Sequence, residues 1–203
     1  TKISDVTVYE TVGTGDVTLN NVNIDTLTTK AGGENSIHLR DSVLGTVKMD
    51  SNAGNEATRL VFSKATVIEN SLTVKDNVKA IIDAENSEIK PSIASLDIKG
   101  NTTIKNIKVQ EIKAKNDIVV ENSTVTTIKA DTKDKVSITL DENTKVEEVK
   151  AKKSVEIKPA DSAKDSKKID KITVEADSIN ITADVPVGEI KPSKNESDTK
   201  DII

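Results

Sequence analysis

Three lysines occupy equivalent positions in consecutive repeats of the sequence. Lys113, Lys129 and Lys150 each stand in the middle of an apolar-x-apolar triplet. If these triplets are neighbouring strands, the three ammonium groups stack on one outward face, where like charges repel each other unless a partner of opposite charge lies beside them. We therefore predict a binding stripe for an anionic polymer such as an acidic polysaccharide. The alternative is a solvated face whose charge is neutralised by the neighbouring Glu111 and Glu148.

Four carboxylates form a second candidate site. They occupy outward positions at one predicted strand and are expected to form an acidic row of Asp83, Glu85, Glu121 and Asp141. Carboxylate oxygens are preferred ligands of Ca²⁺, so calcium is the one cofactor that we consider. Parallel β-helices include polysaccharide lyases and hydrolases, which would need clustered acids beside a basic residue, and this hypothesis rests on fold analogy. The alternative is that the row is simply solvated charge.

The sequence lacks the residues that other common types of catalytic site require. His38 is the only histidine, so a Ser-His-Asp triad would depend on it alone, and no cysteine is present to serve as a nucleophile or zinc ligand. HExxH, GxSxG and phosphate-loop motifs are also missing. His38, Arg40 and Arg59 make up a third patch, for which exposed strand residues are the simpler interpretation. We therefore expect a non-catalytic protein with no cofactor other than the calcium considered above.

The elements that would position these groups belong to a repeat. Segments 17–27, 37–49 and 118–130 share one pattern: apolar-x-apolar, a polar corner, one apolar residue, two polar residues, and apolar-x-apolar again. Alternation with a period of two on each side of the corner predicts strands rather than helices. Equivalent apolar residues recur roughly every twenty positions, which is typical of a solenoid.

This repeat predicts an all-β fold, a single-stranded parallel β-helix. One coil cannot bury its apolar face alone, so about nine coils of roughly 20 residues must stack around a lumen of branched aliphatic side chains. The only aromatic residues are Tyr9 and Phe62, which suits a narrow lumen. Irregular coil lengths favour the right-handed type. We assign residues 1–190 to the β-helix and residues 191–203 to a linker-like tail.

Asparagine and aspartate recur at the polar corner. The residues that occupy or nearly occupy this position are Asn21, Asp41, Asn86, Asn122 and, with a one-residue slip, Asn143. Both residue types tolerate the left-handed backbone that a sharp corner requires, and stacked Asn amides can bond to one another along the axis. We interpret these residues as a structural ladder rather than a binding site.

Charge and hydropathy exclude several partners. The net charge is −5, and the opposing charges are spread evenly along the chain, which gives no general affinity for nucleic acid. No apolar run is long enough to span a bilayer, so direct membrane insertion is not expected. These observations leave a polysaccharide as the partner class to consider, with the oligomeric state open.

Segments 15–24 and 31–42 resemble β-helical repeats of large Gram-positive cell-surface proteins that also carry S-layer homology or other wall-anchoring modules. The resemblance implies export, an extracellular location at the cell surface, and a role as stalk, adhesin or glycan-contacting surface. Our first hypothesis is therefore a non-catalytic structural or adhesive segment of a secreted bacterial protein. The alternatives are a binding module for acidic cell-wall or plant glycans and a lyase-like enzyme.

Overall fold

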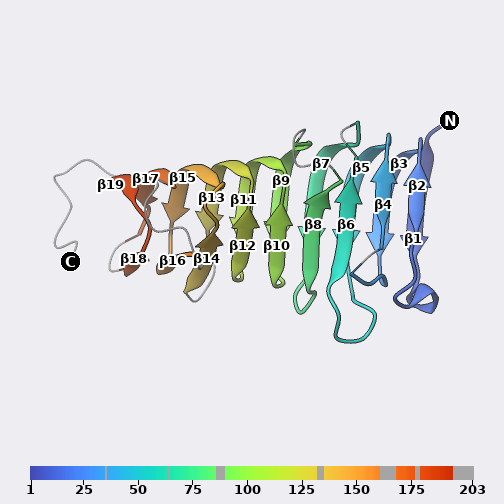
Figure 1. The fold of residues 1–203 in the computed structure, drawn as a ribbon, viewed down its shortest axis with the longest axis horizontal. Coiled ribbons are helices and arrows are strands. Elements are labelled where there is room, and N and C mark those ends of the chain that lie inside the picture. Colours follow the sequence, from blue (N-terminus) through green and yellow to red (C-terminus); the bar gives the residue numbers. More distant parts are fainter. Residues whose placement is uncertain are drawn as a thin grey trace.

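The chain folds into a stack of short strands that form two parallel sheets (Figure 1). The computed structural model describes residues 1–34, 36–63, 65–85, 90–131, 135–160, 168–176 and 179–193. It is 60% strand and 2% helix and makes about eight turns of a β-solenoid, so the predicted all-β parallel solenoid is confirmed, with slightly fewer turns than expected. Strands β1 and β19 lie at opposite ends of the stack (Figure 1).

The two sheets contain alternate strands of the chain. Sheet A has ten strands, in the order β1 (Ile3–Val8), β3 (Asn23–Thr29), β5 (Val43–Met49), β7 (Val67–Val74), β9 (Ser92–Ile98), β11 (Lys108–Ala114), β13 (Thr124–Ala130), β15 (Lys145–Ala151), β17 (Ile169–Val174) and β19 (Val187–Pro192). Sheet B has nine, in the order β2 (Thr18–Asn20), β4 (His38–Arg40), β6 (Thr58–Phe62), β8 (Ala80–Ala84), β10 (Thr102–Lys105), β12 (Ile118–Glu121), β14 (Val136–Leu140), β16 (Val155–Pro159) and β18 (Ile181–Ala183). One short 3₁₀ helix, Glu10–Val12, follows β1.

Aliphatic side chains from successive coils form columns that fill the lumen. One column of sheet A consists of Val6, Leu27, Val47, Leu72, Leu96, Ile112, Ile128, Val149, Ile172 and Ile190, each paired in register with the next. The members from Leu27 to Ile172 are completely buried. Burial of this kind contributes about 25 cal/mol per Å² of apolar surface, and a side chain in the column obtains it only with a coil on each side.

Several strands of sheet A share an interruption of their side-chain alternation. In β3, β11 and β15 the inward-outward alternation is broken by two successive side chains that both stay outside the core. These two positions are the paired polar residues of the sequence repeat. The interruption shifts the alternation by one residue, so that side chains on both sides of it are buried in the lumen.

Strand pairing at the C-terminal side extends past residue 190, where the sequence places the end of the β-helix. Strand β19 ends at Pro192, and the backbone N–H of Ser193 still donates to the carbonyl of Val174, so strand pairing continues slightly beyond residue 190. Residues 194–203 of the predicted tail lie outside the described residues. Among the described residues, no helix is long and apolar enough to cross a membrane.

Gly100, in the turn between β9 and β10, provides a test of how closely the coils approach each other. A Cβ at this position would lie 2.1 Å from the carbonyl oxygen of Val78 and 2.6 Å from that of Lys75, so backbone must move to admit it. We expect Gly100→Ala to lower the free energy of unfolding by about 3 kcal/mol, measured by urea denaturation. Gly54, at φ +64° with no atom within 4 Å of an added Cβ, is the control. Its replacement by Ala should cost only about 1 kcal/mol from left-handed strain, and equal losses would contradict the predicted clash.

Candidate functional site

The predicted lysine row forms on the outer face of sheet A. Lys113 of β11 pairs in register with Lys129 of β13, which pairs with Lys150 of β15. All three side chains are substantially exposed. The neighbouring coils continue the row with Asp97 at one end and Thr173 at the other, so the lysines form an isolated group of three.

Glutamates on the adjacent outward column pair with these lysines. Lys129 Nζ lies 2.5 Å from Glu111 Oε2, and Lys113 Nζ lies 3.6 Å from Glu111 Oε1. Lys150 Nζ lies 3.7 Å from Glu148 Oε2, the carboxylate that also binds a further lysine, Lys171, at 2.8 Å. Sequence analysis left open whether the glutamates neutralise the row, and the ion pairs support that alternative.

These contacts shift the titration of the glutamates. The hydrogen bond from Lys129 holds the pKa of the Glu111 carboxyl below its usual value, and the same bond raises the pKa of Lys129. Burial would raise the pKa of Glu148, but hydrogen bonds from Lys171 and Thr173 and the charge of Lys150 outweigh it and lower that pKa. Both carboxylates therefore favour the charged form in the folded chain.

A shallow depression lies where β13 and β15 end. Its volume is about 170 Å³, and its lining consists of Lys129, Ala130, Asp131, Lys150, Lys152 and Glu175. Three ammonium groups and two carboxylates therefore surround one hollow. The volume suits a small anionic group, such as the carboxylate of a sugar acid, that competes with the two protein carboxylates for the lysines.

The predicted row of solvated carboxylates is wrong at Asp83. This side chain is only 5% exposed, although it stands at an outward position of β8. Its Oδ2 accepts hydrogen bonds from Arg59 Nη2 at 2.6 Å and Nε at 3.2 Å, and its Oδ1 accepts from the backbone N–H of Ala84. The arginine of the preceding coil covers the carboxylate, which the strand alternation alone does not reveal.

The other three carboxylates are also engaged. Glu85 pairs with Arg40 Nε at 2.7 Å and lies 3.7 Å from His38 Nδ1, whereas Glu121 pairs with Lys105 at 2.9 Å. Asp141 accepts the backbone N–H of Asn122 on both oxygens. In the part of the chain that the structure describes, no three His, Asp or Glu side chains are arranged to hold a metal ion, so the calcium hypothesis finds no donor set there.

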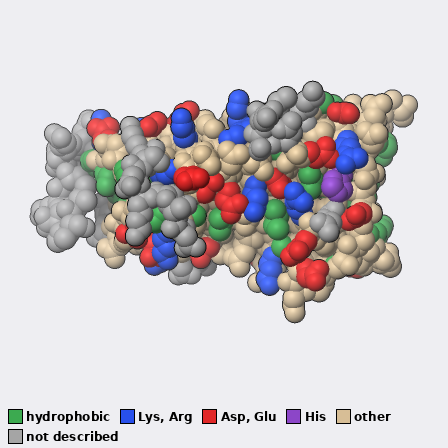
Figure 2. Space-filling model, in the orientation of Figure 1, with side chains coloured by type: hydrophobic (Ala, Val, Ile, Leu, Met, Phe, Trp, Pro, Cys, Tyr) green, Lys and Arg blue, Asp and Glu red, His purple; other side chains and the backbone are tan. Residues whose placement is uncertain are grey.

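The third candidate patch and half of the acidic row form one cluster. His38, Arg40 and Arg59 lie beside Asp83 and Glu85 on the outer face of sheet B, and Figure 2 shows the single histidine among basic and acidic side chains. Sequence analysis treated these groups separately because their strands belong to different coils. Stacking places opposite charges next to each other, which favours a structural ion-pair network.

The corner ladder is confirmed in part. Asn21, Asp41 and Asn122 have positive φ values of 53°, 48° and 43°, as the corner requires. Asn106, at φ 58°, belongs with them and was missed, although it stands two residues after Ile104 as Asn122 stands two after Val120.

Two predicted members of the ladder differ from this group. The prediction that Asn143 belongs to the ladder is wrong, because its φ is not positive. Its corner is one residue longer than the corner of the preceding coil. Leu140 and Lys145, on either side of this corner, pair with Val120 and Thr124, which are one residue closer together in the sequence. The longer corner turns without a left-handed residue at Asn143. Asn86 lies outside the described residues.

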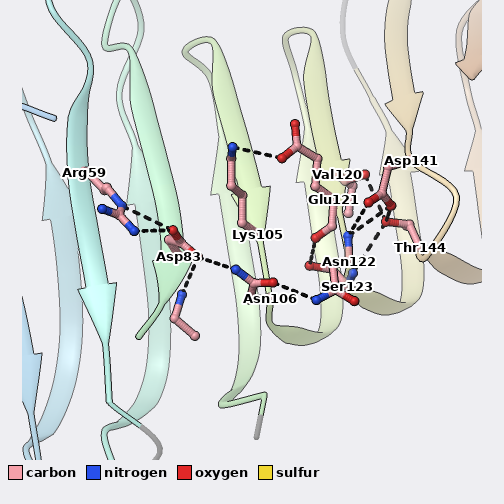
Figure 3. A network of polar contacts seen from close by, with 11 residues as sticks. Arg59, Asp83, Lys105, Asn106, Val120, Glu121, Asn122, Ser123, Asp141 and Thr144 are labelled. Carbon is pink, nitrogen blue, oxygen red and sulfur yellow. Dashed lines mark hydrogen bonds and ion pairs between the residues drawn. The ribbon is translucent and has the colours of Figure 1, made fainter. Parts of the chain in front are cut away.

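Side chains at these corners bond along the axis (Figure 3). Asn122 Nδ2 donates to Asn106 Oδ1 at 2.7 Å, and Asn106 Nδ2 donates to Asp83 Oδ1 at 2.8 Å. The predicted amide-to-amide bond therefore exists between these two coils.

Behind this network, buried hydroxyls accept N–H groups of the preceding coil. Ser42 Oγ accepts from Val22, Ser123 Oγ from Ile107, and Thr144 Oγ1 from Ser123. These hydroxyls satisfy backbone donors that the corner removes from the sheets. Sequence analysis missed this second ladder, whose signal is a Ser or Thr directly before the next strand.

The ion pairs on sheet A predict acid sensitivity. Because the pKa values of Glu111 and Glu148 are lower in the folded than in the unfolded chain, their stabilisation is complete above about pH 5 and is lost as pH falls through the folded values. We expect the free energy of unfolding to fall from pH 5 to about pH 3, and to fall less in the double variant Glu111→Gln with Glu148→Gln. The control carries Glu10→Gln and Glu147→Gln at two exposed positions. Equal acid sensitivity of the two double variants would contradict the assignment.

Comparisons with known proteins add no relative to this picture. No protein-family model matches the chain, and neither a curated protein nor a solved structure matches it. The assignment of the fold therefore depends on the repeat and on the strand pairing described above. The resemblance to Gram-positive surface proteins stays an expectation from the sequence.

Proposed function

We propose that this chain is a non-catalytic structural and adhesive segment of a secreted bacterial cell-surface protein. The observation that carries the proposal is the continuous pairing of ten parallel strands in sheet A, which two local register shifts, between β5 and β7 and between β7 and β9, do not break. At about 4.8 Å per strand, this sheet extends for about 43 Å along the axis. A stack held by aliphatic columns on the inside and ion pairs on the outside is suited to holding other modules at a fixed distance.

The engagement of the polar groups also supports a structural role. Arg59 and Arg40 are each bound to a carboxylate of a neighbouring coil, and Lys105 is bound to Glu121. Groups that stabilise one another in this way are not held ready for proton transfer, for which an acid or base must reach a substrate. These ion pairs therefore favour a spacer over a lyase-like enzyme.

The spacer proposal predicts that coil number matters more than coil identity. Asn106 and Asn122 are equivalent and sixteen residues apart, so residues 106–121 form one exchangeable coil. We would display variants with zero, one, two or three copies of this coil between a wall anchor and an epitope tag on bacterial cells. The rod should lengthen by about 4.8 Å per copy, and antibody access to the tag should rise with each copy.

Two results would contradict the spacer. One is tag access that does not change with copy number although the variants keep their strand content by circular dichroism. The other is tight binding of the purified chain to a defined glycan through one face, which would make recognition rather than distance the primary role.

A second candidate function is recognition of an acidic polysaccharide on sheet A. The observation that favours it is the depression lined by Lys129, Lys150 and Lys152. Two members of the lysine row meet there, and the hollow offers three ammonium groups to one ligand. A carboxylated polymer could exchange its carboxylates for those of Glu111 and Glu148. Such binding must weaken with salt because the site is exposed.

A charge-removal experiment tests this second function. The variant with Lys113→Gln, Lys129→Gln and Lys150→Gln should lose salt-sensitive retention on immobilised polygalacturonate. The matched control carries Lys105→Gln and Lys158→Gln on sheet B and Lys135→Gln directly before β14, which removes the same charge and also breaks ion pairs. The control should be retained like the parent chain. Identical retention of both variants would contradict recognition by the lysine row.

A further inference from the structure

One lysine reaches along the corners to an amide two coils away. Lys90 stands just before β9, and its Nζ donates a hydrogen bond to Asn122 Oδ1 at 3.0 Å, although the two residues are 32 positions apart. The lysine side chain passes the intervening corner at Asn106. It is part-buried there, beside the polar network of Figure 3, of which Asn122 is a member.

The carboxamide of Asn122 is fixed in orientation. Its Nδ2 donates to Asn106 Oδ1 at 2.7 Å, so its carbonyl end faces the lysine amine. The backbone of Asn122 is held as well, with φ 43° and its N–H donated to both oxygens of Asp141 at 3.0 Å. An amine and a carbonyl group held together in this way have a high effective concentration for reaction with each other.

The pKa of Lys90 and the presence of a nearby carboxylate favour an attack by the amine. Burial is the main reason that the pKa of Lys90 is below its usual value, and the positive charge of Lys108 lowers it further. A lowered pKa increases the fraction of neutral amine, which is the nucleophilic form of a lysine. The charge of Asp141 acts on Lys90 in the opposite sense. Both oxygens of this carboxylate accept the backbone N–H of Asn122 at 3.0 Å, so a proton acceptor lies beside the residue that is attacked.

We propose that Lys90 and Asn122 form an intramolecular isopeptide bond. The lone pair of Lys90 Nζ attacks Cγ of Asn122, forming the new N–C bond. The bond from Cγ to Nδ2 then breaks, and Nδ2 leaves as ammonia. Asp141 takes a proton from Lys90 Nζ and delivers it to the departing nitrogen. The balance is amine plus carboxamide giving secondary amide plus ammonia, with no oxidant, reductant or cofactor.

The bond would be an axial cross-link in a chain that has no disulfide. The sequence contains no cysteine, and the link ties the corner before β9 to the corner before β13. Apart from the continuous backbone, the coils contact their neighbours through strand pairing, packing and ion pairs. A covalent loop of about 32 residues restricts the unfolded chain, so the cross-linked form should unfold at a higher urea concentration than the open form.

Intact mass spectrometry tests the proposal directly. The purified full chain, incubated at pH 9 to favour the neutral amine, should weigh less than its sequence mass by one ammonia molecule. Peptide mapping should recover one branched peptide that joins the segments containing Lys90 and Asn122. Lys90→Arg keeps the positive charge and should retain the full sequence mass, while Lys108→Arg at the same corner should still lose ammonia.

Two outcomes would overturn the proposal. The first is a wild-type mass that stays equal to the sequence mass after prolonged incubation. The second is a loss of ammonia that persists in Lys90→Arg, because this loss would come from ring closure at an asparagine rather than from the lysine. Lys90→Arg leaves the left-handed corner residue Asn122 in place, so its interpretation does not depend on a variant that changes the turn.

Discussion

The stacking of each coil on the next in register is the constraint on which the rest of this structure depends. A strand of three to eight residues has no stable partner within its own coil, so both its backbone hydrogen bonds and its apolar face must be satisfied by neighbouring coils. Register is strict because a shift by one residue would move Leu96 or Ile112 from the lumen to the surface. This requirement explains why the columns consist of branched aliphatic side chains along nearly their whole length.

The same constraint determines where charges can lie. A residue on the outer face recurs at about 4.8 Å intervals, so a column of identical charges would repel itself over the entire stack. The chain limits the run of consecutive lysines in this column to three members, with Asp97 and Thr173 on either side. It sets the carboxylates of Glu111 and Glu148 one column away, within reach of two coils each. Neutralisation therefore acts between columns as well as along them, which preserves solubility without destabilising the sheet.

The sequence predicted the walls of the coils better than their surface. The lumen columns and the alignment of Lys113 with Lys129 followed from spacing alone, because a period of two and a recurring frame are direct consequences of strand geometry. The burial of Asp83 could not be predicted from the spacing. Its backbone position faces outward, but the long side chain of Arg59 folds over it and buries the carboxylate. Which long side chain turns towards which neighbour depends on three-dimensional packing between coils, and a linear pattern contains no information on it. The handedness of the solenoid stays a prediction from coil length.

The corners behave differently from the walls because they absorb the variation in coil length. Sixteen residues separate Asn106 from Asn122, whereas 23 separate Leu39 from Phe62, the paired residues that precede two other corners. Even so, the corner side chains of successive coils remain within bonding distance, since the strands on both sides fix where each corner begins and ends. A corner therefore combines freedom of sequence with a fixed position in space. Polar side chains that reach across two coils, as Lys90 does, can be introduced at a corner without disturbing the lumen. The corners, rather than the sheet faces, are therefore the places where this fold can bring reactive groups of different coils together.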